Sequence, residues 1–287
     1  MKTWGNTGRA TASGIVIGGA VLWLLSLISL IVTSPSGTEI SSDPSAQAVP
    51  YWVTLTPLAV GIALTLILPG SSSPLRPVEV SSWKSFRVTT TGLVVLAVLF
   101  PLATVAVPLM GEAYVLGKLV LFVIVPAILL LVVRGSVSIT GRRDSSRWWA
   151  PAIVIVVWTL LSQVAPWNPV FDPVGFDMAF ILTAAIATAI TAGVGEELFY
   201  RRWLQTRLEA LLGAWPGIVM TSLAFALMHL GSHGTGAPLV DLARVIVVQG
   251  SFGLFVGVMW WRYRNLTAII TVHIISNGWA VAAALLR

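Results

Sequence analysis

Apolar segments recur along almost the whole chain, and they restrict its fold more than any other feature. Each is close to the ~20 residues that an α-helix needs to cross a bilayer. Because lipid offers no hydrogen-bond partner to an open strand edge, such segments are expected to be helical. The alternating segments of a membrane β-barrel do not occur. The sequence therefore predicts an all-α polytopic membrane protein, a bundle of about eight to nine transmembrane helices.

Nine segments qualify as spans. The first follows Lys2 and Arg9 and is interpreted as a retained helix, because its apolar run is too long for a signal peptide. If two spans were merged across the short connection 111–114 or 262–265, the number of spans would change from odd to even. We expect residues 1–177 to form an N-terminal scaffold of about five transmembrane spans and residues 178–287 to form a C-terminal transmembrane domain, in which the polar residues concentrate. The spans lie at about 13–33, 51–69, 92–110, 115–134, 148–164, 178–195, 215–230, 242–261 and 266–286.

Most of the 17 basic residues fall in alternate connections, while the connections at 34–50, 111–114, 165–177 and 231–241 contain none. By the positive-inside rule, this bias predicts a cytoplasmic N-terminus and an outer C-terminus. Basic residues on the cytoplasmic side are attracted to anionic lipid headgroups, and this accounts for the net charge of +6. We therefore expect membrane lipids as partners and no nucleic acid. With no cysteine, thiolate sites and disulfides are excluded. We expect a multi-pass protein of a cell membrane, in bacteria the inner or plasma membrane.

Two adjacent carboxylates, Glu196 and Glu197, directly follow an apolar span, and Arg201 comes four residues later. Ionisable groups at such a place cost several kcal/mol unless they are paired or solvated, so they predict a functional site. On an α-helix Glu197 and Arg201 form a favourable i,i+4 pair. Glu196 points about 100° away and has no cation of its own. The pattern predicts one neutralised carboxylate and one available for chemistry.

Two further pairs at i,i+4 spacing follow: Phe225 with His229, and His273 with Asn277. Together with Glu196 they would supply a base, imidazoles for proton transfer or metal binding, and an amide donor. Each has a structural alternative. A histidine or Asn277 can join neighbouring helices, Phe225 can be ordinary packing, and the acidic cluster can end a span. Their occurrence in order on successive spans favours a common site.

The ordered motifs Glu-Glu-x-x-x-Arg, Phe-x-x-x-His and His-x-x-x-Asn, within roughly 180–284, resemble those of the CPBP intramembrane proteases. That family includes CAAX prenyl endopeptidases of the Rce type and bacterial Abi or bacteriocin-processing proteins. The resemblance implies an intramembrane endopeptidase with a catalytic cavity in the C-terminal half, acting on a membrane-associated protein or peptide. It implies that Glu196 and His229 activate water and that His273 and Asn277 stabilise the oxyanion. The supporting residues would be Glu197, Arg201 and Phe225.

The cofactor stays open at this point. Proteins of this family are often called metalloproteases, and Glu196, His229 and His273 could supply three ligands to zinc, with water as the fourth. The chain has no His-Glu-x-x-His motif, and the sequence favours a site without a tightly bound metal. Zinc is the alternative.

Two other functions are compatible with the sequence. The chain could be a non-catalytic membrane scaffold or regulator that retains the protease fold. It could also be a transporter or channel with a charged relay, although transporters usually repeat their polar elements in both halves. The substrate and the oligomeric state are left undetermined. The pattern Gly253-x-x-x-Gly257 predicts close approach to a neighbouring helix or to a second subunit.

One geometric difficulty accompanies these predictions. Glu196 follows a span that is expected to end at residue 195, whereas His229 would lie roughly 20 Å along the next helix. The two can meet if Glu196 lies deeper, or if the helix breaks at Gly193 and Gly195. A break would leave a surface segment with Arg201, Arg202, Arg207 and Glu209, and a water-filled cavity open to the cytoplasm. Either way, Glu196 should lie within a water-bridged distance of His229 or His273.

Overall fold

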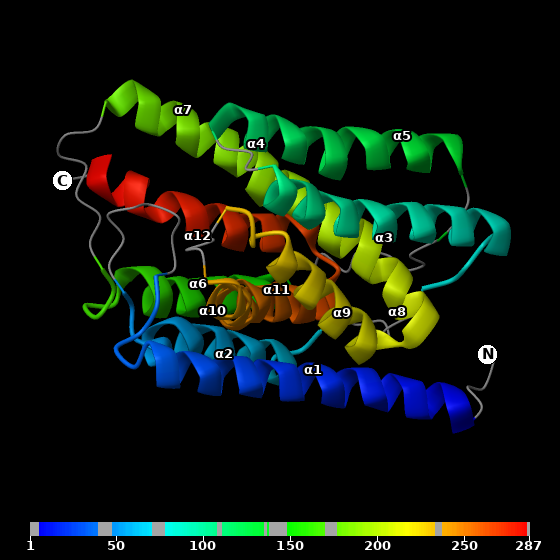
Figure 1. Ribbon diagram of the computed structural model, residues 1–287, viewed down its shortest axis with the longest axis horizontal. Coiled ribbons are helices and arrows are strands. Elements are labelled where there is room, and N and C mark those ends of the chain that lie inside the picture. Colours follow the sequence, from blue (N-terminus) through cyan, green and yellow to red (C-terminus); the bar gives the residue numbers. More distant parts are fainter. Residues whose placement is uncertain are drawn as a thin grey trace.

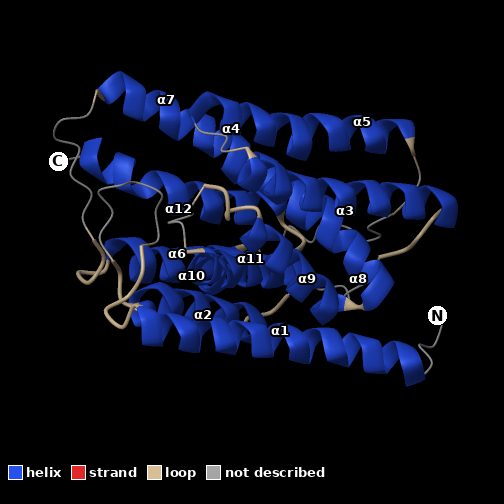
Figure 2. Cartoon of the chain, viewed as in Figure 1, coloured by secondary structure: helices blue, strands red, loops and turns tan. Residues whose placement is uncertain are grey.

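The structure is a computed structural model that describes residues 6–39, 48–70, 78–107, 111–134, 137, 148–169, 177–232 and 237–285. Throughout these ranges the regular elements are helices, and the β-structure consists of isolated bridge residues, such as the pair Thr38 and Val49 (Figure 2). The predicted all-α class is therefore confirmed.

The N-terminal half contains long helices with few polar interruptions. Ser82 caps one of them, since its side-chain oxygen accepts a hydrogen bond from the Ser85 N–H at 3.4 Å. Two helices contain π-helical turns. The elements are α1 (Asn6–Thr33), α2 (Tyr51–Ile67), α3 (Trp83–Ala106), the continuous α4 (Gly111–Lys118), η1 (Leu119–Ile124) and α5 (Val125–Val132), and α6 (Trp149–Thr159) with η3 (Leu160–Val164).

The C-terminal half is built in the same way. Its last connection is short because Arg264 adopts a left-handed backbone conformation, with φ of 47°, and ends the preceding helix. The elements are the continuous α7 (Met178–Thr188), η4 (Ala189–Gln205) and α8 (Thr206–Leu212); α9 (Ala214–Leu227); the continuous α10 (Pro238–Val245), η5 (Ile246–Gly250) and α11 (Ser251–Tyr263); and α12 (Leu266–Leu285).

Among the described residues, six helices are long and apolar enough to cross a membrane. Three of the predicted spans are shorter apolar helices, at Tyr51–Ile67, Trp149–Val164 and Ala214–Leu227. All nine predicted segments thus contain a helix, but the predicted count of eight to nine spans is not confirmed. The outer side chains are strongly apolar, with Val132 and Leu239 76% and 80% exposed. Extended apolar surface of this kind suits lipid, and the chain is a multi-pass membrane protein.

The helices run mostly alongside one another, with α1 and α2 on one side of the bundle and α5 and α7 on the other (Figure 1). Between these sides, α12 packs against η4 and α6. Basic connections on which the predicted orientation depends, such as 71–77 and 138–147, lie outside the described residues. The N-terminus on the cytoplasmic side therefore stays a prediction.

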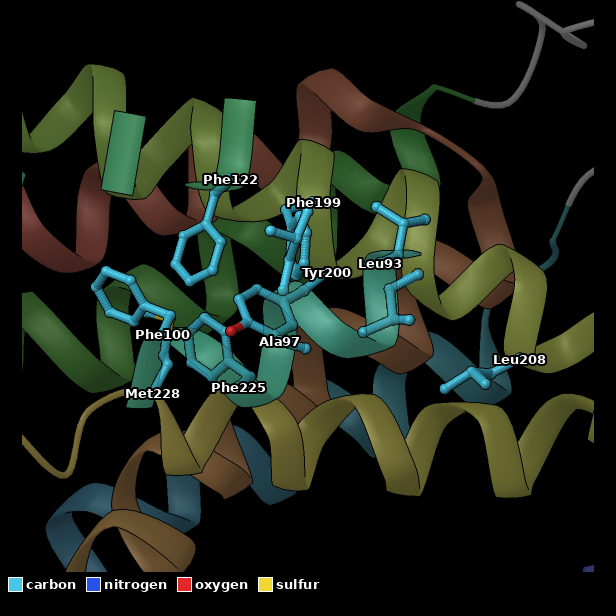
Figure 3. Close-up of a cluster of buried hydrophobic side chains, with 11 residues drawn as sticks. Leu93, Ala97, Phe100, Phe122, Phe199, Tyr200, Leu208, Phe225 and Met228 are labelled. Carbon is cyan, nitrogen blue, oxygen red and sulfur yellow. The ribbon is translucent and has the colours of Figure 1, made fainter. Parts of the chain in front are cut away.

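Two buried clusters join the two halves of the chain. In the first, Phe100 of α3 and Phe122 of η1 pack with Phe199 and Tyr200 of η4 and with Phe225 of α9 (Figure 3). The second cluster joins α2 and α6 to α11 and α12 around a set of side chains that includes Leu58, Trp158, Phe255 and Val272. The N-terminal helices therefore pack directly against the elements that carry the three motifs.

The glycine pattern at 253 and 257 has a clear neighbour. A Cβ atom at Gly253 would lie 3.3 Å from Ser222 Cα, and one at Gly257 would lie 3.3 Å from Ile218 Cγ2. Both neighbours belong to α9. Of the two predicted partners, a neighbouring helix of the same chain is the one that occupies this face.

Candidate active site

The first motif lies on a π-helix rather than at the end of an α-helix. Element η4 runs from Ala189 to Gln205 and carries Glu196, Glu197 and Arg201. A π-helix this long is rare, and π-turns tend to occur at functional sites. Together α7, η4 and α8 form one 35-residue helix, Met178–Leu212, with Glu196 near its middle. The predicted end at residue 195 is therefore wrong, and Glu196 lies deeper than that boundary implied.

Gly193 and Gly195 do not break the helix, which was the other predicted solution. They allow other helices to approach instead. A Cβ atom at Gly193 would lie 2.6 Å from Ile274 Cγ1 of α12, and one at Gly195 would lie 3.0 Å from Val123 Cγ2 of η1. Real Cβ contacts are longer than the first of these distances. The missing side chain of Gly193 thus lets α12 bring its histidine next to the carboxylates.

Glu196 is fully buried and is contacted from two other elements. Its Oε1 accepts a hydrogen bond from the Lys118 ammonium at 2.6 Å, from the C-terminal end of α4. Its Oε2 lies 3.8 Å from His273 Nε2 and accepts no hydrogen bond from the described residues. The predicted approach of Glu196 to one of the two histidines is confirmed, with His273 as the partner.

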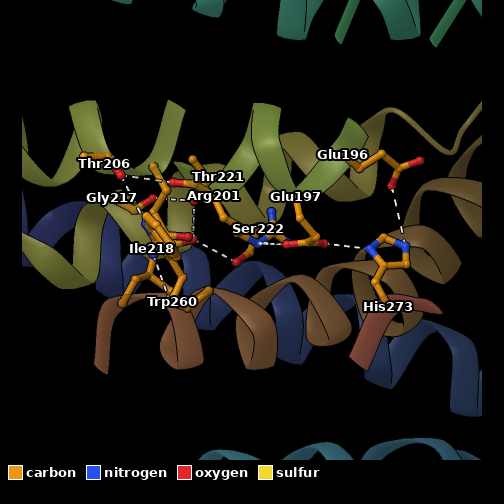
Figure 4. A network of polar contacts seen from close by, with 12 residues as sticks. Glu196, Glu197, Arg201, Thr206, Gly217, Ile218, Thr221, Ser222, Trp260 and His273 are labelled. Atoms are coloured by element: carbon orange, nitrogen blue, oxygen red, sulfur yellow. Dashed lines mark hydrogen bonds and ion pairs between the residues drawn. The ribbon is translucent and has the colours of Figure 1, made fainter. Parts of the chain in front are cut away.

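Glu197 lies on the other side of the same imidazole. Its Oε1 accepts a hydrogen bond from His273 Nδ1 at 2.6 Å, and its Oε2 lies 3.5 Å from Arg201 Nε. The His273 ring therefore lies between the two carboxylates (Figure 4). The predicted i,i+4 pair of Glu197 and Arg201 is present, and both side chains are fully buried. A carboxylate at Nδ1 fixes which ring nitrogen points toward Glu196.

The predicted amphipathic surface segment does not form. Arg201, Arg207 and Glu209 are all buried, and Arg202 is the exposed member of that set. Buried charges require partners, and each of these has one. Arg207 Nε donates to Thr89 Oγ1 at 3.1 Å, and Glu209 forms an ion pair with Arg264. Arg201, Arg207 and Glu209 therefore lie inside the helical bundle and not on its surface.

His229 lies just beyond α9, which ends at Leu227, and not on the helical face predicted for it. Its ring nevertheless contacts Phe225, because Nδ1 lies 2.8 Å from the Phe225 carbonyl oxygen. A carbonyl can only accept, so Nδ1 carries the hydrogen and Nε2 is the acceptor of the neutral ring. Phe225 also contacts the Arg201 guanidinium, 4.7 Å from its ring centre, and the His273 ring at 6.0 Å. His233 lies outside the described residues.

The four residues predicted to be catalytic share one cavity of about 870 Å³. His273 and Asn277 both lie on α12, as their spacing predicted, and Asn277 is exposed while His273 is buried. Glu197 and Arg201 do not line the cavity. They contact residues that do, since Glu197 binds His273 and Arg201 packs against Phe225. The lining includes Lys118, Glu196, Phe225, His229, His273 and Asn277.

The arrangement does not fit the alternative zinc site. Within the ranges that the structure describes, no group of three His, Cys, Asp or Glu side chains could hold a metal ion. Glu196 already binds the Lys118 ammonium through Oε1, and a cation at the same carboxylate would be repelled by it. His273 Nδ1 is taken by Glu197. These side chains would have to rearrange to form a three-ligand set.

Lys118, within the predicted span 115–134, is a residue of the site that the three motifs do not include. A signal was available, because a lone lysine in an apolar span is itself a functional-site hypothesis. The motifs also do not include three polar residues that line the cavity from α6–η3 and the turn after it, Ser162, Gln163 and Asn168. Elements treated as scaffold therefore form part of the site.

Comparison with known proteins agrees with the geometry. A family model described as type II CAAX prenyl endopeptidase Rce1-like matches residues 177–279. This part of the chain is thus similar to that family. The resemblance to the CPBP and CAAX proteases, predicted from three motifs, is thereby confirmed, and the match contains all three. Neither the curated proteins nor the solved structures gave a match. Lys118 and the cavity wall from α6–η3 lie outside the matched residues.

Proposed function

We propose that the protein is an intramembrane endopeptidase in which Glu196 activates the attacking water. One observation carries the proposal. Glu196 Oε2 is buried at a cavity, accepts no hydrogen bond within the described part of the chain, and lies 3.8 Å from an imidazole nitrogen. A carboxylate oxygen with an unused lone pair beside a histidine is suited to hold and deprotonate a water molecule.

The reaction begins when this water attacks the carbonyl carbon of a peptide bond in the cavity. Glu196 accepts one proton from the water as the C–O bond forms. His229, with Nδ1 held by the Phe225 carbonyl, presents Nε2 as a second acceptor. The proton then passes to the leaving nitrogen, the C–N bond breaks, and a carboxylic acid and an amine are released. Prepositioned groups of this kind contribute ~10²–10⁴ in rate.

The oxyanion of the tetrahedral intermediate requires donors, and we assign His273 and Asn277 to it. Glu197 keeps His273 in one orientation and balances the charge of a protonated ring, as a buried carboxylate does for a catalytic histidine. The Asn277 amide lies one helical turn further along α12. Donors that are already fixed in place stabilise a developing negative charge without further reorganisation.

The substrate class follows from the position of the site. Glu196 is near the middle of a membrane-crossing helix, so the scissile bond must enter the hydrocarbon region. A membrane-associated protein or peptide meets this requirement. We place the enzyme in a cell membrane, the bacterial inner or plasma membrane, with a cytoplasmic N-terminus and the catalytic elements in residues 178–287.

The test uses detergent-purified protein and a quenched-fluorescent peptide library, with wild type compared with Glu196→Gln, each with and without a chelator. The expected result is cleavage that resists the chelator and falls at least ~100-fold in the variant. Chelator-sensitive cleavage that zinc restores would instead favour a metal held by Glu196, His229 and His273. Equal cleavage by the two proteins would refute the assignment of Glu196. The scaffold alternative predicts no cleavage and an unchanged cellular phenotype for Glu196→Gln.

A further inference from the structure

Lys118 is a buried cation that reaches the proposed base from outside the Rce1-like segment. It lies at the end of α4, its side chain is 9% exposed, and its Nζ is 2.6 Å from Glu196 Oε1. The same ammonium lies 4.6 Å from the centre of the Tyr114 ring. Charged groups are buried at such a cost that they are normally paired. The pair joins positions that are 78 residues apart.

The contact makes the two oxygens of Glu196 different. Oε1 is occupied by Lys118, whereas Oε2 accepts no hydrogen bond from the described residues and faces His273 Nε2. A carboxylate on a flexible side chain could present either oxygen to water. With one oxygen fixed by a short charge-assisted hydrogen bond, the other is held toward the cavity.

We propose that Lys118 is a positioning residue for catalysis, which binds Oε1 of Glu196 and thereby selects Oε2 as the atom that takes the proton from water. This inference rests on the proposed function of Glu196. It makes α4, an element of the predicted scaffold, part of the reaction machinery. The prediction that Glu196 has no cation of its own is therefore wrong, because Lys118 is that cation.

The chemistry supports a positioning role. The charge-assisted hydrogen bond from the ammonium fixes Oε1 of Glu196, so the carboxylate keeps one orientation and presents Oε2 to a water molecule. The Tyr114 ring also contacts the ammonium through a cation–π interaction. Lys118 also lines the cavity. The paired carboxylate Glu197 has Arg201 in the corresponding position, so each acid of the motif has its own cation.

The experiment compares peptide cleavage by the wild type, Lys118→Met, Lys118→Arg and Lys118→Ala. The methionine variant should lose ~100-fold in kcat, the scale expected when a reacting group is misplaced by about 1 Å, with KM little changed. Lys118→Arg, which keeps the charge, should retain most of the rate. Added ethylammonium should partly restore Lys118→Ala, whereas ethanol, which is neutral and of similar size, should not. A purely structural lysine would not produce this charge-specific rescue.

Folding is measured in parallel, because Lys118→Met leaves Glu196 as a buried unpaired charge. The double variant Lys118→Met/Glu196→Gln removes both charges and should regain the wild-type unfolding midpoint without regaining activity. Lys84→Met, at an exposed lysine of α3, is the matched control and should behave as wild type.

The outcomes separate the two proposals. If the wild type cleaves no peptide, the proposed function fails. If the wild type cleaves and Lys118→Met cleaves equally fast, only the role of Lys118 is overturned. A slow Lys118→Met with neither arginine nor ethylammonium rescue would likewise overturn the positioning role and leave Lys118 as a structural cation.

Discussion

Replacing Glu197 by glutamine should destabilise the protein strongly, because it leaves a buried arginine without a countercharge. Arg201 is 0% exposed, and its three side-chain nitrogens make no hydrogen bond to the described residues. Among the described residues, it forms an ion pair with Glu197, whose Oε2 lies 3.5 Å from Nε. The glutamine keeps the shape and removes the charge. Unpairing a buried ion pair typically costs about 3–5 kcal/mol.

Other contacts of Arg201 cannot absorb this loss. The guanidinium lies 4.7 Å from the centre of the Phe225 ring, and such a cation–π contact contributes ~2 kcal/mol when desolvated. That contribution is present both before and after the substitution, so it does not offset the lost charge. A cost of about 4 kcal/mol is a large part of the ~5–15 kcal/mol that stabilises a typical protein.

The assay is unfolding in mixed micelles of a mild detergent and SDS, followed by tryptophan fluorescence. The double variant Glu197→Gln/Arg201→Met is the control, because replacing both charges by groups of similar volume is often neutral or stabilising. We expect it to regain most of the stability lost by the single variant. A loss below ~1 kcal/mol for Glu197→Gln would refute the argument, as would a double variant no more stable than the single one.

Activity should not return with stability in the double variant. His273 would have lost the carboxylate at Nδ1, which is 2.6 Å away in the structure. We expect cleavage to stay reduced by about 100-fold or more, within the range for general acid–base groups. Recovery of both stability and rate would show that Glu197 acts only through Arg201.

Two further substitutions test the packing that supports the site. Gly193→Leu should separate η4 from α12 and lower cleavage, since even a Cβ there would lie 2.6 Å from Ile274 Cγ1; Gly14→Leu, with no atom within 4 Å of its Cβ position, is the control in peptide cleavage and thermal unfolding. Phe225→Ala should cost about 3–5 kcal/mol in the micelle assay, because this buried ring contacts Arg201, His229 and His273. An unchanged midpoint for Phe225→Ala would contradict that packing role.

The sequence by itself determined the features that depend on local periodicity and composition. Apolar length predicted membrane helices, because a buried backbone in lipid must satisfy its own hydrogen bonds. Spacing of four residues predicted the pairing of Glu197 with Arg201 and placed His273 and Asn277 on one helix. The three motifs in order predicted the family that matches residues 177–279.

Other features were decided by the tertiary structure. Apolar periodicity does not say where an α-helix widens into a π-helix, so the span ending at residue 195 was placed too short. Glycines in a helix can permit either a break or a close approach. At Gly193 the neighbouring Ile274 of α12 decides between them. The turn that holds His229 likewise depends on how α9 ends against its neighbours.

The contact of Lys118 with Glu196 is the clearest example of a feature that local sequence patterns do not predict. It spans 78 positions and arises because η1 and η4 pack side by side. No local pattern links the two residues. The cost of burying either charge alone predicts that a partner exists for each, but only the packing of the helices determines which partner it is.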